Sequence, residues 1–418
     1  MKKHHPLIDT LIHLKGNRRA CVYTEPLWGI PYNLYTPYTS LYMHALGITD
    51  GQIGLIISIG MVFQILFALL SGAITDKMGR RKTTFIFDLI SWSVPTLIWA
   101  SAQNFTWFLA AALFNSVWRL TSNSWTCLMV EDSEPESLVG TYSWIYISGL
   151  IAAFFAPLSG LFVSWNGLVP TVRFLYLFAF FSMTAKFFLL YHFSTETRQG
   201  IIRMGQVRDH SILRILGQYG EILKQVLHSP QTLVSIGILL VMSIFNTVNG
   251  SFWSLLITSR VGIPEEVVAL FPFLRSIIML VLFFALIPRI RTSHFRRPLL
   301  AGFFICAVSQ LLLISAPEKG YFIVILSTVL EAFALALINP LADSLVAISV
   351  DPKERARVMS IVYVTVIAVT SPFGWLAGIL SEIHRILPFL MNIALFGIGC
   401  ILTYLSGKVS RYKNSSMD

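Results

Sequence analysis

Long apolar runs are the feature that most restricts how this chain can fold. Twelve of them occur, separated by glycine, proline or clusters of charge, and each is close to the roughly 20 apolar residues that a helix needs to cross a bilayer. The sequence therefore predicts an all-α membrane protein with twelve transmembrane helices. The predicted spans are 22–46, 53–75, 84–102, 105–130, 140–164, 170–193, 231–258, 266–287, 299–316, 321–349, 358–382 and 388–407.

Charged side chains are too scarce for a soluble protein. Only 12% of the residues are charged and 55% are hydrophobic, whereas an ordinary soluble domain has roughly 25% charged residues. Most of the surface must therefore face lipid. The sequence has no nucleotide-binding loop, metal-ligand cluster or hydrolytic triad, so we expect a protein that is not an enzyme and has no cofactor.

The distribution of lysine and arginine predicts the orientation in the membrane. With the N-terminus inside, the cytoplasmic segments hold 24 of the 31 basic residues, and the outside loops hold three. Basic residues concentrate in cytoplasmic loops, so both termini are expected in the cytoplasm, with the plasma membrane as the location. The net charge of +10 is then a signal of topology, and we expect no nucleic-acid partner.

The longest polar connection divides the chain into two halves. We expect an N-terminal bundle over 21–193 and a C-terminal bundle over 231–407, flanked by cytoplasmic segments 1–20 and 408–418. Between the bundles, apolar residues from Ile212 to Leu227 recur at helical spacing. This pattern predicts, within the linker 194–230, an amphipathic helix that lies in the membrane interface.

A short charged loop lies between the second and third predicted spans. Its sequence from Gly72 to Lys82 is GAITDKMGRRK. This loop resembles the signature loop of the major facilitator superfamily of secondary transporters, and every specified position of that pattern is matched. The residues at the specified positions are Gly72, Asp76, Lys77, Gly79, Arg81 and Lys82, and Arg80 is a further base of the loop.

The resemblance implies a twelve-helix bundle in which this loop is a conformational latch. Asp76 would meet the end of the eleventh helix, and the bases would meet acids at the foot of the fourth helix, here Glu131 and Asp132. In the second half, Asp343 would take the part of those acids. The alternative is that the bases only hold the loop on the cytoplasmic side.

The two halves are weakly similar to each other, which predicts pseudo-symmetric six-helix bundles. Pro157 in the fifth span and Pro372 in the eleventh are each followed by small residues, 215 positions apart. Two halves related in this way enclose a substrate site near the bilayer midplane in many transporters.

Charged residues inside the predicted spans are candidates for function because burying them in lipid is costly. Arg119, Arg275 and Glu331 lie near the middle of the fourth, eighth and tenth spans. We expect Arg119 and Glu331 to face each other and couple proton movement to the substrate; a pair of Glu331 with Arg275 is the alternative. Glu25 either joins the proton-coupling groups or caps the first helix.

The first, fourth, seventh and tenth helices line the cavity in the family that the chain resembles. In this sequence they are rich in amides and polar aromatics, which stack on and hydrogen-bond small organic solutes. About half of the aromatic residues would instead anchor helices at the interface. The predicted cavity residues are Tyr32, Asn33, Thr36, Asn115, Trp118, Asn123, Asn246, Asn249 and Trp253.

These features predict a monomeric secondary active transporter that moves a small organic solute by alternating access, coupled to protons. Two other functions stay open. An uncoupled facilitator or a lipid translocase of the same fold would not depend on Glu331 or Glu25, and a transporter-derived sensor would bind its ligand without flux. The substrate and the direction of transport do not follow from the sequence.

Overall fold

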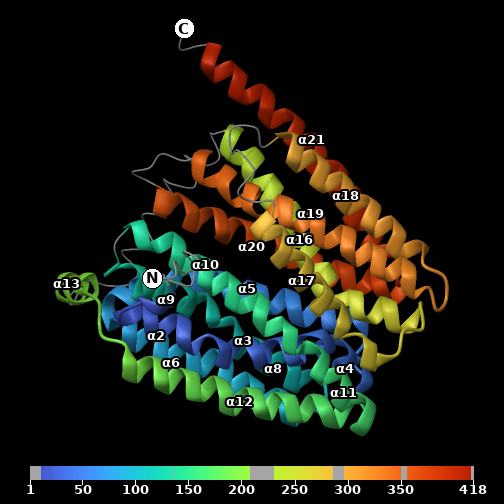
Figure 1. The fold of residues 1–418 in the computed structure, drawn as a ribbon, viewed down its shortest axis with the longest axis horizontal. Coiled ribbons are helices and arrows are strands. Elements are labelled where there is room, and N and C mark those ends of the chain that lie inside the picture. Colours follow the sequence, from blue (N-terminus) through green and yellow to red (C-terminus); the bar gives the residue numbers. More distant parts are fainter. Residues whose placement is uncertain (1–10, 134, 208–229, 286–295, 350–354, 416–418) are drawn as a thin grey trace, which may run out of the picture. The chain divides into compact units, whose positions relative to one another are not determined.

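The computed structural model describes residues 11–133, 135–207, 230–285, 296–349 and 355–415. Over these ranges the chain is helical and contains no β-strand (Figure 1). It divides into two compact units. Unit 1 comprises residues 1–36 and 59–217, and unit 2 comprises residues 37–58 and 218–418.

Unit 1 contains the helices of the first half of the chain except for residues 37–58, which belong to unit 2. Helix α12 packs against α3 and α7, while α6 packs against α9. The elements are α2 (Gly16–Thr24), α3 (Pro26–Tyr35), α5 (Asp50–Met78) from residue 59 onward, α6 (Arg80–Asp88), η2 (Leu89–Ser93), α7 (Val94–Ser101), α8 (Phe105–Ser116), α9 (Trp118–Val130), α10 (Pro135–Ala152), η3 (Ala153–Phe155), α11 (Ala156–Asn166), α12 (Leu168–Phe193) and α13 (Arg198–Val207).

Unit 2 contains the second half together with residues 37–58. Helix α18 packs against both α19 and α21, and α16 packs against α20 and α21. The elements are most of η1 (Thr36–Tyr38), α4 (Thr39–Ala45), the first turns of α5, α16 (Pro230–Ser259), η4 (Glu265–Val267), α17 (Leu270–Ala285), α18 (Arg296–Ser315), α19 (Tyr321–Ser349), α20 (Arg355–Ile383) and α21 (Leu387–Ser415).

Nine helices of the described part are long and apolar enough to cross a membrane, and they correspond to nine of the twelve predicted spans. The spans 22–46 and 105–130 are helical but interrupted, so neither forms one long helix. The span 266–287 is described only as far as Ala285, where α17 ends. The amphipathic helix predicted between Ile212 and Leu227 lies outside the described residues.

Prolines explain the interruptions in the first and fifth spans. A proline has no N–H to donate to the carbonyl four residues earlier, so it bends or breaks a helix. Pro26 begins α3 directly after α2. Pro157 follows η3, a tight 3₁₀ turn that separates α10 from α11. The small residues of this region are buried, and Gly29 of α3 lies close to Ala152, where an added Cβ would be 3.1 Å from the alanine Cβ.

The core of unit 2 is built from apolar side chains on the four helices α16, α18, α19 and α21. Phe245 of α16 lies against Phe396 of α21, with ring centroids 5.1 Å apart. Phe303 of α18 also meets Phe396 and approaches Gly399, where an added Cβ would be 3.0 Å from its ring. These close contacts fix how α16, α18 and α21 pack, and they hold the polar residues of the same helices in place.

Candidate transport site and signature-loop network

The signature loop is a tight turn between α5 and α6 that only glycine can form. Gly79 has φ +85° and ψ 158°, a backbone conformation that is essentially restricted to glycine. A Cβ at this position would also lie 2.5 Å from a carboxylate oxygen of Glu196. Both the conformation and the lack of space therefore require glycine at Gly79.

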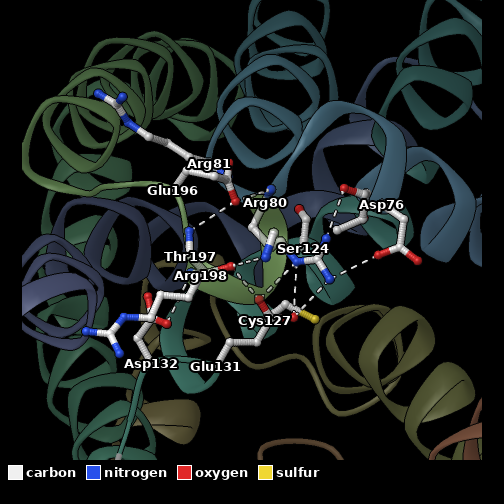
Figure 2. A network of polar contacts seen from close by, with 12 residues as sticks. Asp76, Arg80, Arg81, Ser124, Cys127, Glu131, Asp132, Glu196, Thr197 and Arg198 are labelled. Carbon is white, nitrogen blue, oxygen red and sulfur yellow. Dashed lines mark hydrogen bonds and ion pairs between the residues drawn. The ribbon is translucent and has the colours of Figure 1, made fainter. Parts of the chain in front are cut away.

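Arg80 is the centre of a polar network at this end of unit 1 (Figure 2). Its guanidinium forms an ion pair of 3.0 Å with Asp76, four residues earlier. The same group donates from Nε to both carboxylate oxygens of Glu131, each at 3.0 Å. The Arg80 side chain is 5% exposed, so these charge-assisted bonds are shielded from water. The contact between a loop base and Glu131 is thus observed; its role as a latch remains a proposal.

Glu196 was not identified from the sequence, yet it completes the network. Its carboxylate accepts hydrogen bonds from the backbone N–H groups of Arg80, at 2.9 Å, and Arg81, at 3.0 Å. These are the first N–H groups of α6, which the N-cap residue Gly79 has no side chain to satisfy. An acid at a helix N-terminus is also favoured by the helix dipole. The signal in the sequence was an acid placed just after the sixth span, near the same membrane face as the loop.

The remaining residues of the predicted latch differ in their surroundings. Arg81 donates to the backbone carbonyl of Tyr191 at 2.6 Å and stacks on its ring. The carboxylate of Asp132 accepts from the backbone N–H of Arg198 at 3.2 Å. Lys77 and Lys82 are exposed, and Gly72 is half-buried.

Two predicted latch contacts remain predictions. The side chain of Asp343 is outside the part of α19 whose burial and contacts are described. The loop bases expected to meet it, Arg289 and Arg291, lie outside the described residues. The contact of Asp76 with the end of the eleventh helix would join the two units.

A second polar cluster surrounds Glu331 on α19 in unit 2. The carboxylate is 1% exposed and forms an ion pair of 2.6 Å with Arg275 of α17. It also accepts from the amides of Asn249 on α16, at 3.1 Å, and Gln310 on α18, at 3.3 Å. Four helices thus converge on one acid. Gln310 was missed by the sequence analysis because a lone amide in an apolar run carries no specific pattern.

The contacts of this cluster suit an ionised carboxylate. All three neighbours donate, and an ionised carboxylate only accepts. Arg275 is the more open partner, since its side chain is 27% exposed. The structure therefore contains the pair of Glu331 with Arg275 that the sequence left as an alternative. The predicted approach of Arg119 to Glu331 would join the two units and stays a prediction.

Arg119 is held within unit 1 by a polar and an aromatic neighbour. Its Nε donates to the side-chain oxygen of Gln64 on α5 at 3.3 Å, and its guanidinium lies 4.1 Å from the centroid of the Trp118 ring. Stacking on a tryptophan face stabilises a cation in a poorly solvated place.

Glu25 forms a further ion pair, which was not predicted. Its carboxylate is 2.8 Å from Nζ of Lys186, which is 5% exposed and lies over the rings of Trp28 and Trp125. Glu25 also lies at the N-cap position of α3, as the alternative predicted, although its side chain makes no capping hydrogen bond. Lys186 is therefore a buried cation that pairs within unit 1.

The predicted cavity residues fall into both units. In unit 1, Tyr32 stacks on Trp28 with centroids 4.7 Å apart, and the Asn115 amide donates to the carbonyl of Ser91 at 2.9 Å. Three more are half-buried and make local contacts. The Asn33 amide donates to the carbonyl of Gly29, the Thr36 hydroxyl donates to the carbonyl of Tyr32, and the thiol of Cys127 contacts the Asn123 oxygen. In unit 2, Asn246 is exposed, Asn249 binds Glu331, and Trp253 packs edge-on against Phe271.

Helices of membrane-spanning length, a charged loop between two of them and buried ion pairs within each unit define a multi-pass membrane protein. Residues 29–295, more than half of the chain, match the sequence profile of the Major Facilitator Superfamily. The chain belongs to this family.

Individual relatives are distant or match only in part. Over 63 residues the chain is 41% identical to the niacin transporter NiaP of Acinetobacter baylyi, which covers 15% of this chain and 14% of that protein. The chain thus matches only about a seventh of the length of that curated relative.

Solved transporter structures cover nearly the whole chain at low identity. The nucleoside transporter NupG matches with a TM-score of 0.71 at 13% identity, covering 94% of this chain and 99% of that one. The human organic anion transporter MFSD10 (TETRAN) matches with a TM-score of 0.67 at 16% identity, covering 96% and 100%. A POT family transporter in complex with a thioalcohol-conjugated peptide matches with a TM-score of 0.72 at 12% identity, covering 94% and 96%. These likenesses confirm the predicted fold.

Proposed function

We propose that this protein is a proton-coupled secondary active transporter that moves a small organic solute across the plasma membrane by alternating access. Membership of the family supports transport, and the similar proteins are named for niacin, nucleosides, a peptide and organic anions. All of these are small organic solutes. The observation that carries the proposal is the buried pair of Glu331 with Arg275.

The pair supplies a physical basis for proton coupling. An isolated charge in the middle of a bilayer costs about 3 kcal/mol or more, and here each charge offsets the other at 2.6 Å. Protonation of Glu331 would remove the charge that holds Arg275. The guanidinium, which is partly exposed, would then be available to an anionic group of the solute. Release of the solute would restore the pair and expel the proton.

Other charged groups have supporting roles in this proposal. Arg119 would face Glu331 at one stage of the cycle, and Glu25 with Lys186 would form a second titratable pair in the other unit. The amides and aromatic residues predicted from the sequence would line the route of the solute. The network around Arg80 would act as the cytoplasmic latch, with both termini on that side.

The test uses purified protein in proteoliposomes, with a solute first identified by a thermal-shift screen. Glu331→Gln keeps the size of the side chain and an oxygen that can accept from Arg275, but it cannot bind and release a proton. Uptake driven by an imposed pH gradient should be lost, while exchange of labelled for unlabelled solute should persist. Glu318→Gln, which alters an exposed acid of a loop, is the matched control and should behave like the wild type.

The outcomes separate the alternatives. Gradient-driven uptake at the normal rate in Glu331→Gln would contradict the proposed coupling. Wild-type uptake that does not respond to a pH gradient would instead identify an uncoupled facilitator.

A further inference from the structure

Helix α13 runs across the end of the bundle in unit 1. In Figure 1, α12 is seen from the side and α13 nearly end-on, so the two helices of this unit point in clearly different directions. Since α12 is long and apolar enough to cross the membrane, a helix that crosses its end lies along the membrane surface. Helix α13 ends at Val207, so it is distinct from the amphipathic helix predicted between Ile212 and Leu227.

The start of α13 is fixed to unit 1 by hydrogen bonds. Thr197 caps the helix, because its hydroxyl oxygen accepts from the backbone N–H of Gly200 at 2.9 Å, while the hydroxyl itself donates to Glu131. The backbone N–H of Arg198 donates to Asp132. Gly200 is also pressed against Glu196, where an added Cβ would lie 2.2 Å from a carboxylate oxygen. The position of α13 is therefore set by the structure of the unit.

The same loop is joined to the start of α2. Asn17 donates from its amide to the carbonyl of Thr195 at 2.9 Å, and it accepts from the N–H of Thr195 at 2.8 Å. These two hydrogen bonds join chain segments that are 178 residues apart. They hold Lys15 and Arg18, at the start of α2, beside Arg198 at the start of α13.

A cavity of about 750 Å³ lies between these segments, and Lys15, Arg18 and Arg198 line it together with Ile202. Its volume falls within the range of pockets that hold small molecules. The two acids at its edge are already engaged: Glu131 by Arg80 and Thr197, and one oxygen of Asp132 by α13. In Figure 2 the guanidinium of Arg198 points away from Arg80 and its network. Among the described residues, no ion pair joins Lys15, Arg18 or Arg198 to an acid, so all three bases can contact an anion.

Ile202, which lines the basic cavity, is one of several exposed apolar side chains on α13 and at the end of α12. Ile201 is 60% exposed and Ile202 is 52% exposed on α13, and Phe193 at the end of α12 is 64% exposed. A free phosphate or a nucleotide would not use this surface. Basic residues next to exposed isoleucines at the end of a membrane helix match a phospholipid, which has an anionic headgroup and apolar chains.

We propose that this cavity binds an anionic phospholipid of the cytoplasmic leaflet, with its phosphate against Lys15, Arg18 and Arg198 and its acyl chains over Ile201 and Ile202. The proposal does not depend on the transported solute or on proton coupling. It has a consequence for the signature loop, because Glu131 holds both Arg80 and the start of α13. Lipid binding should therefore stabilise the network around Arg80.

Binding is tested with the purified full-length protein in a neutral detergent, by titrating lipid and following the melting temperature. Phosphatidylglycerol should raise the melting temperature, whereas phosphatidylcholine and glycerol phosphate should not. The double variant Lys15→Gln with Arg198→Gln keeps the backbone anchors of α13. It should weaken binding about fivefold for each base removed. Arg297→Gln, which removes an exposed base in unit 2, is the control and should leave the titration unchanged.

The position of α13 is tested separately in liposomes that contain phosphatidylglycerol. The four native cysteines are replaced, Ile202→Cys is introduced, and the new thiol is labelled with an environment-sensitive fluorophore. Lipids that carry a nitroxide near the headgroup should quench the label, and a water-soluble quencher should be less effective. Equal stabilisation by phosphatidylcholine, an unchanged titration in the double variant, or a label that lipid nitroxides do not quench would each overturn the proposal. The last result would mean that other residues of the chain or a second copy cover α13.

Discussion

At the scale of single residues, the structure requires glycine at one of two glycine positions in the signature loop. Gly79 has a backbone conformation that other residues avoid, and an added Cβ would meet Glu196. Gly72 lies within helix α5, and an added Cβ would meet nothing within 4 Å. The family pattern specifies glycine at both positions, but the structure requires it only at Gly79.

This difference gives a matched pair of substitutions. Gly79→Ala should destabilise the protein by about 1–3 kcal/mol, because alanine is strained at this φ and ψ, and it should displace the carboxylate that caps α6. Gly72→Ala should be neutral or stabilise the protein by up to about 1 kcal/mol, since alanine is the better helix former. Melting temperatures of the two variants in detergent check both expectations. Equal losses would show that Gly72 is needed for a contact outside unit 1.

At the scale of elements, α6 begins without a capping side chain of its own and takes one from a distant segment. The carboxylate of Glu196 accepts from the N–H groups of Arg80 and Arg81, 116 and 115 positions away in the sequence. The start of α6 therefore depends on the segment that follows α12.

Glu196→Gln tests this dependence. The amide keeps one oxygen that can accept but loses the charge, so we expect a loss of about 1 kcal/mol, as for other helix caps. Hydrogen exchange should quicken at the first turn of α6 and stay unchanged in α18. Glu318→Gln, at an exposed loop position, is the control for loss of one acid. Unchanged exchange at Arg80 and Arg81 in Glu196→Gln would contradict the capping role.

At the scale of the whole molecule, the fold could be predicted from the sequence because lipid imposes a simple rule. Every span needs an apolar run, and the loop from Gly72 to Lys82 carries a pattern specific to one family. The site could be predicted only in part. Glu331 stands out as a deep charge, but the donors of Gln310 and the carboxylate of Glu196 reach their partners through tertiary packing. Contacts of this kind cannot be predicted from the spacing of apolar residues along the sequence.

The distribution of lysine and arginine predicts the orientation of the chain in the membrane. With the cytoplasmic segments rich in bases, a cysteine introduced at Arg198 should react with a membrane-impermeant thiol reagent only after the cells are opened. A cysteine at Lys319 should react in intact cells, because this residue lies in a predicted outside loop and is exposed. Both experiments use a background without the native cysteines. The reverse pattern of labelling would contradict the assignment of both termini to the cytoplasm.

The last prediction concerns Asp76 and movement between conformations. In unit 1 Asp76 forms an ion pair with Arg80, and Arg80 also pairs with Glu131. Arg80 would therefore retain one acidic partner if Asp76 were replaced. The Asp76 side chain is 29% exposed, so the pair should contribute at most about 1 kcal/mol to stability. Asp76→Asn should therefore fold normally and bind solute with unchanged affinity. If Asp76 also meets the end of the eleventh helix in one conformation, as the family resemblance implies, the variant should lose most of its flux. Thermal-shift titration measures the affinity, and proteoliposome uptake measures the flux. Reduced affinity with normal flux would place Asp76 at the solute site and contradict the latch.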